Sequence, residues 1–186
     1  MKHLIFILCI FALGCGVHNQ KKAINDARLG LAIAGEATHM ADLAAVEYFE
    51  EFPAEDTKMY CKGEIVTLVL EEVVSVLQAG ADSVKLWETS LGVYLAKRDA
   101  GGETKVDWDL VLSSEAAWFQ IAVDVVAVVD LAMREMEHAG QPVPSIIKYA
   151  WEFLYGMTGK PAREPYEMDW GDLKSGVCGQ YLGGGP

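Results

Sequence analysis

The chain has few basic residues. Fifteen lysines and arginines stand against 27 aspartates and glutamates in 186 residues, which gives a formal net charge of −12. The longest basic runs are the pairs Lys21-Lys22 and Lys97-Arg98. A protein that binds nucleic acid needs a cationic surface to displace counterions from phosphates, so we expect no nucleic-acid partner. Electrostatic attraction to anionic lipid head groups is disfavoured for the same reason.

Motifs that commonly carry enzyme chemistry are missing as well. The sequence contains neither a G-x-S-x-G nucleophile pattern nor a glycine-rich phosphate loop. It has no C-x-x-C pair and no cysteine–histidine spacing typical of a zinc site. We therefore expect no catalysis and no cofactor, and we take a structural, binding or interaction role as the default.

What is present is a large apolar fraction, 52 % of the residues, in a chain long enough for one domain with a sizeable core. Apolar residues recur at helical spacing along most of residues 15–156, so we predict an all-α, up-down helical bundle over that range. Pro53 ends the first segment, Asp56 is placed to cap the second, and Gly140 ends the third. The predicted helices are three long ones, at about 20–52, 57–99 and 106–139, and a short fourth at about 144–155.

The second long segment keeps one helical phase throughout, which favours a single helix of roughly 40 residues. Glycine is unfavourable inside a helix, so a break at Gly80 remains the alternative. Two runs rich in β-branched residues could instead form strands, but each lies inside a longer amphipathic pattern. These runs are Ile65–Leu70 and Val125–Val129. In the first helix, Gly30 and Gly35 are expected to permit close helix packing.

Residues 157–186 are rich in glycine, proline, aromatic and charged residues, which predicts an irregular C-terminal tail. Its aromatic residues are candidates to dock the tail on the bundle. They are Tyr166, Trp170 and Tyr181.

The N-terminal segment carries the most functional information. Lys2 precedes an uninterrupted apolar run of ten residues, Leu4–Leu13. A permanent membrane-spanning helix needs about 20 residues, so this run fits the apolar part of a secretory signal better. We therefore expect residues 1–14 to be a signal peptide. Uncleaved retention as an N-terminal helix is an alternative.

The sequence Ala12-Leu13-Gly14-Cys15 resembles the lipobox of bacterial lipoproteins, in which a small residue precedes an obligatory cysteine. It departs from the common pattern at Ala12, where leucine is usual, and at Leu13, where a smaller residue is usual. The resemblance implies that Cys15 becomes the acylated first residue and that the lipid anchors the protein in a membrane. Gly16 after the cysteine resembles outer-membrane sorting. Ordinary cleavage and export without lipid is the other alternative.

Four cysteines occur. Cys9 would leave with the signal and Cys15 would carry lipid, so Cys61 and Cys178 remain. In an oxidising compartment the two thiols could form a disulfide that fastens the tail to the bundle. Two unpaired thiols are an equal alternative, because the sequence does not give their distance.

The strongest indication of an enzyme is a pair of Glu-x-x-His motifs, Glu36–His39 and Glu135–His138. Two such motifs and two further glutamates form the di-iron site of ferritin-like bundles. The further ligands would be Glu71 or Glu72, and Glu152. Metal ligands must point into the core, however, and the helical phase places both motifs on solvent-facing sides. A di-metal enzyme is thus the alternative function.

Asp130 falls near an apolar stripe, where a buried carboxylate would have a perturbed pKa suited to acid–base chemistry. The structural interpretation is an ion pair with a residue such as Arg134. A third possible function, an apolar-ligand carrier, needs an internal cavity. Our main expectation is an exported, lipid-anchored helical protein of the outer membrane or cell surface, facing the periplasm or exterior. Its partners would be the membrane and an envelope protein.

Overall fold

The computed structural model describes residues 16–52, 56–158, 166, 168–174 and 176–182. The segment 1–15, including Cys15, lies outside these residues. Within them the chain is helical and contains no strand, so the all-α prediction, with three long helices and a short fourth, is confirmed. The elements are α2 (Val17–Glu50), α3 (Thr57–Asp99), α4 (Lys105–Ala139) and α5 (Ser145–Thr158), followed by the short 3₁₀ helices η1 (Gly171–Lys174) and η2 (Val177–Tyr181).

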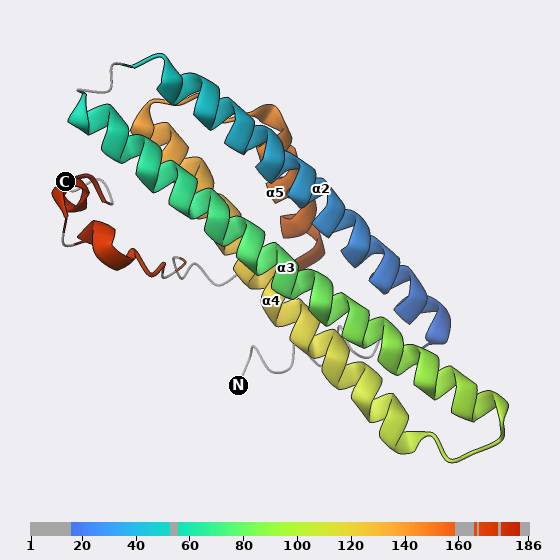
Figure 1. Ribbon diagram of the computed structural model, residues 1–186. Helices are drawn as coiled ribbons and strands as arrows, with labels where there is room; N and C mark the ends of the chain where they lie inside the picture. Colours follow the sequence, from blue (N-terminus) through green and yellow to red (C-terminus); the bar gives the residue numbers. More distant parts are fainter. Residues whose placement is uncertain (1–15, 53–55, 159–165, 167, 175, 183–186) are drawn as a thin grey trace, which may run out of the picture.

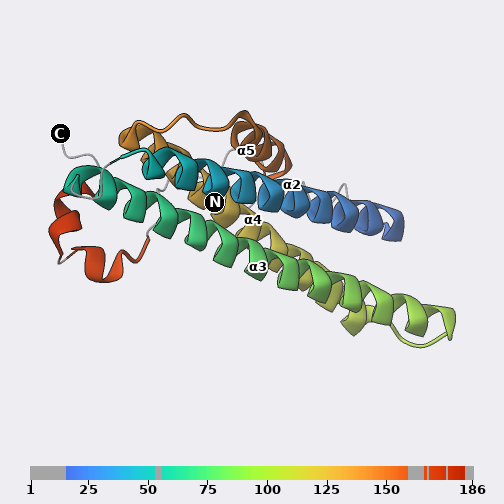
Figure 2. The same ribbon diagram turned by 45° about the horizontal axis from the view of Figure 1, so that its top comes forward.

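The four α-helices form an up-down bundle in which α3 packs against α2 on one side and α4 on the other (Figure 1). The short helix α5 also packs against both α2 and α4, so α2 and α4 occupy diagonal positions and do not contact each other through their backbones. Because α5 has only 14 residues, it covers only the middle part of α2 (Figure 2), where it lies against Gly30, Ala34 and Ala37. We call the half of the bundle that holds α5 and the connection from α2 to α3 the four-helix end, and the half that holds the start of α2 the three-helix end.

The helix boundaries follow from local capping. At the start of α3, the Asp56 carboxylate accepts hydrogen bonds from the backbone N–H groups of Lys58 and Met59, both at 3.1 Å. At the end of α4, Gly140 adopts a φ of 86°. The backbone N–H of Gly140 donates to Glu137 and that of Gln141 donates to Met136, which is the Schellman arrangement.

Helix α3 is continuous through Gly80, so the predicted single helix is correct and the alternative break does not occur. Gly80 is buried where three helices meet. A Cβ atom there would lie 2.9 Å from Leu31 Cδ2 of α2 and 3.3 Å from Trp118 of α4. The absence of a side chain at Gly80 therefore allows the three helices to approach closely, and this packing outweighs the poor helix propensity of glycine.

The β-branched runs at 65–70 and 125–129 are helical and supply core residues.

The core has two parts. At the four-helix end, small residues of α2 (Ala34, Ala37, Ala41 and Ala45) lie against valines and leucines of α3 and α4. At the three-helix end, larger side chains fill the space, including Ile24, Trp87 and Trp118.

The buried side chain of Gln20 joins three helices at the three-helix end. Its amide accepts a hydrogen bond from Trp87 Nε1 of α3 and donates one to Glu115 of α4, both at 2.7 Å. Because a buried amide left unpaired is costly, these two bonds favour this register of α2 over neighbouring ones.

Helix α4 is, among the described residues, the one helix long and apolar enough by composition to cross a membrane. Core helices of soluble proteins pass the same test. Residues from along its length lie in both core clusters, against α3 and α5. We interpret α4 as a core helix of the bundle.

The two glycines expected to allow close packing in α2 differ. A Cβ atom on Gly30 would lie 3.0 Å from Leu154 and 3.2 Å from Met157 of α5. Gly35 is exposed, and a Cβ atom there would meet nothing within 4 Å. The expectation is therefore wrong for Gly35, because that position faces solvent rather than α5.

These surroundings predict opposite responses to substitution. Gly35→Ala should raise the free energy of unfolding by about 0.5–1 kcal/mol, because alanine favours the helix and has room. Gly30→Leu should lower it by about 1–3 kcal/mol, because the added side chain collides with α5. Urea denaturation followed by circular dichroism measures both. Equal effects at the two positions would contradict the packing of α5 on α2.

Candidate functional site

The two Glu-x-x-His motifs lie on diagonal helices and are not brought together. Glu36 and His39 are exposed on α2, as the helical phase indicates. Glu135 and His138 lie on α4, which has no backbone contact with α2. Within the described ranges, no group of three or more histidine, cysteine, aspartate or glutamate side chains is arranged to hold a metal ion.

Glu135 corrects the sequence analysis, because its side chain is buried, with only 6 % of the residue exposed. The predicted phase was taken from polar residues about three to six turns earlier in α4, where the buried side of the helix is narrower. In the second half of α4, α5 packs on the helix in addition to α3, so the buried side is wider and includes Glu135. Glu135 lies one heptad after Val128 and one turn before Ala139, and both are buried. The local row of residues therefore places Glu135 inward.

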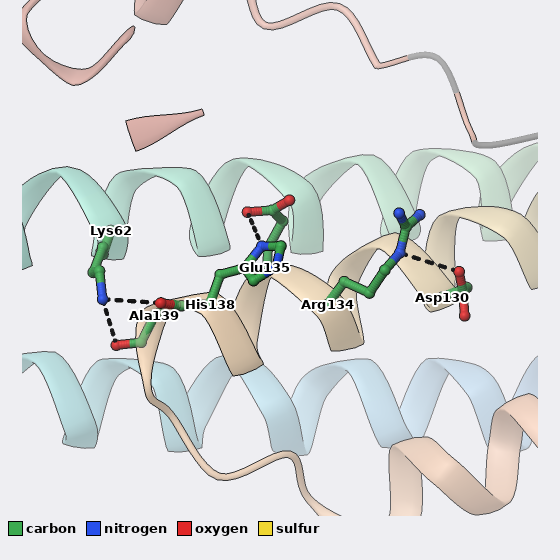
Figure 3. Close-up of polar contacts among 6 residues, drawn as sticks. All are labelled: Lys62, Asp130, Arg134, Glu135, His138 and Ala139. Carbon is green, nitrogen blue, oxygen red and sulfur yellow. Dashed lines mark hydrogen bonds and ion pairs between the residues drawn. The ribbon is translucent and has the colours of Figure 1, made fainter. Parts of the chain in front are cut away.

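The buried Glu135 carboxylate has the neighbouring histidine as its partner. His138 Nδ1 lies 3.6 Å from Glu135 Oε2, and the imidazole is about half exposed. Beside them, Lys62 of α3 reaches the end of α4 and donates from Nζ to the carbonyls of His138 (2.9 Å) and Ala139 (3.1 Å) (Figure 3). A cation there satisfies terminal carbonyls and opposes the negative end of the helix dipole. This cluster therefore fixes α4 to α3.

Asp130 has the structural role expected of it. Arg134, one turn later on α4, lies 3.2 Å from its carboxylate (Figure 3). Both side chains are nearly half exposed, so the pair contributes at most about 1 kcal/mol. Nothing in this geometry prepares Asp130 for acid–base catalysis.

The additional glutamates proposed as metal ligands are dispersed. Glu71 and Glu152 are exposed on α3 and α5. Glu72 is partly buried and accepts a hydrogen bond of 2.5 Å from the Tyr166 hydroxyl of the tail. Burial, this hydrogen bond and the nearby negative charges of Glu72 and Asp124 raise the pKa of Tyr166 above its ordinary value.

The tail is also fastened covalently. Cys61, at the start of α3, forms a disulfide with Cys178 of η2, 117 residues later. Of the two alternatives that the sequence left open, the structure has the bonded one. Met168 is buried in the core cluster, and Tyr166 and Trp170 pack against it. Tyr181, the third residue expected to dock, is partly buried in η2.

One surface feature was missed by the sequence analysis. A groove of about 300 Å³ opens where the end of α2 meets the start of α3. We call it the α2–α3 groove. Its signal in the sequence is the group of aromatic residues and methionine on either side of Pro53. Its lining consists of Ala45, Val46, Phe49, Glu50, Phe52, Met59, Tyr60, Gly63, Glu64 and Thr67.

By contrast, the enclosed void among α2, α3, α4 and α5 measures about 10 Å³. Its walls are mostly small and aliphatic, including Ala34, Val73 and Ala150. A space of this size holds at most about one water molecule, so this void does not support an apolar-ligand carrier.

Comparison of the chain with known protein families, curated proteins and solved structures found no match.

The Tyr166 environment predicts a pH dependence of stability. Its raised pKa means that the folded protein holds the phenol proton more tightly than the unfolded chain does. The stabilisation is therefore complete below the ordinary phenol value of about 10 and is lost as pH rises through the raised folded value. Denaturation measured at pH 8 and above pH 10 should show that the free energy of unfolding falls less with rising pH in Tyr166→Phe than in the parent protein.

The exposed Tyr149 supplies the control, and Tyr149→Phe should keep the parent's alkaline loss. Identical pH profiles for Tyr166→Phe and the parent would contradict docking of the tail through Glu72.

The disulfide predicts a large effect of reduction on stability. Closing a loop of this length lowers the entropy of the unfolded chain, which corresponds to a stabilisation of up to ~4–5 kcal/mol. Cys61→Ser combined with Cys178→Ser should therefore lower the urea midpoint markedly. A reductant should lower the parent's midpoint and leave that of the double variant unchanged. A parent insensitive to reductant, with two titratable thiols, would show that the bond is not formed.

Proposed function

We propose that the protein is an exported, lipid-anchored helical bundle of the cell envelope that binds a partner and does not catalyse a reaction. The observation that carries the proposal is the pairing of Cys61 with Cys178. Stable disulfides are typical of proteins outside the reducing cytosol. The disulfide and the N-terminal signal are independent features, and both favour export.

The anchor is inferred from the sequence alone. Gly14-Cys15 resembles a lipobox, and α2 begins at Val17, two residues after that cysteine. Acylation of Cys15 would therefore place the start of the bundle directly at the membrane surface. Several acyl chains on one residue hold a protein stably on a membrane, whereas a single chain does not.

A binding role is favoured because the buried charged and polar side chains stabilise the fold instead of forming a reactive site. Buried charged side chains support the fold: Glu135 pairs with His138, and Asp107, near the start of α4, pairs with Lys97 of α3 at 2.7 Å. Gln20 bridges helices. Among the described contacts, none combines a nucleophile, a base and an orienting group, the arrangement typical of nucleophilic catalysis. The open α2–α3 groove, in contrast, is available for contact with another molecule.

The proposal predicts the chemistry of the mature N-terminus. Mass spectrometry of protein taken from membranes should find Cys15 as the first residue, carrying acyl groups. Cys15→Ala should move the protein from the membrane fraction to the soluble exported fraction or leave its precursor uncleaved. Cys9→Ala, within the same segment, should change neither.

Two results would contradict the proposal. An unmodified Cys15 in the mature protein would exclude the lipid anchor. An intact residue 1 in a cytosolic protein would exclude export.

A further inference from the structure

We propose that the α2–α3 groove docks a cationic, amphipathic segment of a partner protein. An apolar side chain of the partner would enter the groove, and its lysines or arginines would pair with Glu50 and Glu64. The identity of the occupant as an envelope protein rests on the proposed function. The binding chemistry of the groove is independent of the proposed function.

The floor of the groove is apolar and is held by packing. Gly63 of α3 faces the Phe49 ring of α2, and a Cβ atom there would lie 3.2 Å from that ring. The absence of a side chain at Gly63 lets the Phe49 ring lie against α3, and these two residues line the groove together with the small Ala45. The Phe49 ring also contacts the ring of its neighbour Tyr48 edge to face, with the two ring centroids 5.1 Å apart.

The walls expose apolar surface to water. Val46 is 50 % exposed and Tyr60 is 60 % exposed, and Met59 and Phe52 lie beside them. Aromatic and methionine side chains are enriched at protein interfaces, and tyrosine is among the residues that most often dominate the binding energy. They adapt to an apolar side chain of a partner without a preformed deep pocket.

The groove carries negative charge on both helices. Glu50 of α2 and Glu64 of α3 line it and are exposed. In the part of the chain that the structure describes, neither carboxylate takes part in an ion pair, whereas the nearby Lys62 is directed to the carbonyls at the end of α4. A cationic partner would therefore meet two carboxylates that the bundle leaves unneutralised, which favours its approach and orientation.

The charge and the geometry distinguish this occupant from others. A second copy of the chain would bring the same carboxylates and a net charge of −12, and like charges repel. The groove also lies at the end of α2 opposite to Val17. A helix of 34 residues is about 50 Å long, so an anchor at Cys15 places the groove well away from the anchoring lipid.

The test measures binding of a synthetic, labelled peptide that carries leucine and lysine at helical spacing. Fluorescence anisotropy of the peptide is followed as the full protein, in the form that the cell processes, is added. We expect saturable binding that weakens as salt is raised. The double variant Glu50→Lys/Glu64→Lys should weaken binding at least about tenfold, since it replaces two attractions with two repulsions. The double variant Glu36→Lys/Glu71→Lys makes the same change of charge at exposed sites of the same helices and should change binding less than about threefold.

The apolar contact is tested separately. Tyr60→Ala should weaken binding, whereas Tyr149→Ala, at a residue of similar exposure on α5, should not. Circular dichroism confirms that each variant is folded.

Several outcomes would overturn the proposal. They are absence of saturable binding, equal loss in the two charge variants, equal binding of a peptide with glutamate in place of lysine, and preference for lipid vesicles or self-association over the peptide. An unlipidated Cys15 would overturn the anchor and leave the peptide result standing, so the two proposals fail independently.

Discussion

Burial of the apolar side of α3 between α2 and α4 is the interaction on which the other parts of the structure depend. Val66, Val73, Val84 and Leu91 lie along this side and are nearly inaccessible to solvent. Burying each such side chain contributes about 1.5–3 kcal/mol relative to exposure, so the row is a large part of the bundle's stability. It also requires α3 to remain one helix, because a bend at Gly80 would separate the two core clusters.

The continuity of α3 decides how the two ends of the molecule differ. At the four-helix end, the start of α3 carries Cys61, which fastens the tail, and Lys62, which caps α4. The same turns of α3 provide Tyr60 and Glu64 to the α2–α3 groove. The three-helix end is held by Gln20 and Trp87 and lies next to the start of α2. Under the proposed function, the end with the groove is therefore the end that faces away from the anchor.

Much of this fold was predictable because its helices are bounded by local signals. Asp56 marks the start of α3 and Gly140 marks the end of α4 through interactions within a few residues. The features that the sequence did not predict depend on contacts between residues far apart in the chain. Glu135 is buried because a second helix, α5, packs on the later part of α4 and widens its buried side. The groove arises only when Gly63 and Phe49 meet across two helices. Bonding of Cys61 to Cys178 could not be decided from cysteines separated by 117 residues.

The most direct test of this account is the distance between two spin labels on α3, one at Lys58 and one at Ala96. Pulsed electron paramagnetic resonance measures this distance while the native disulfide is intact. Both positions are exposed, and 38 residues separate them. An unbroken helix predicts one narrow distribution centred near 57 Å, at about 1.5 Å per residue. A broad distribution or a clearly shorter distance would mean that α3 bends at Gly80. The groove and the start of α2 would then not be held at opposite ends of the bundle.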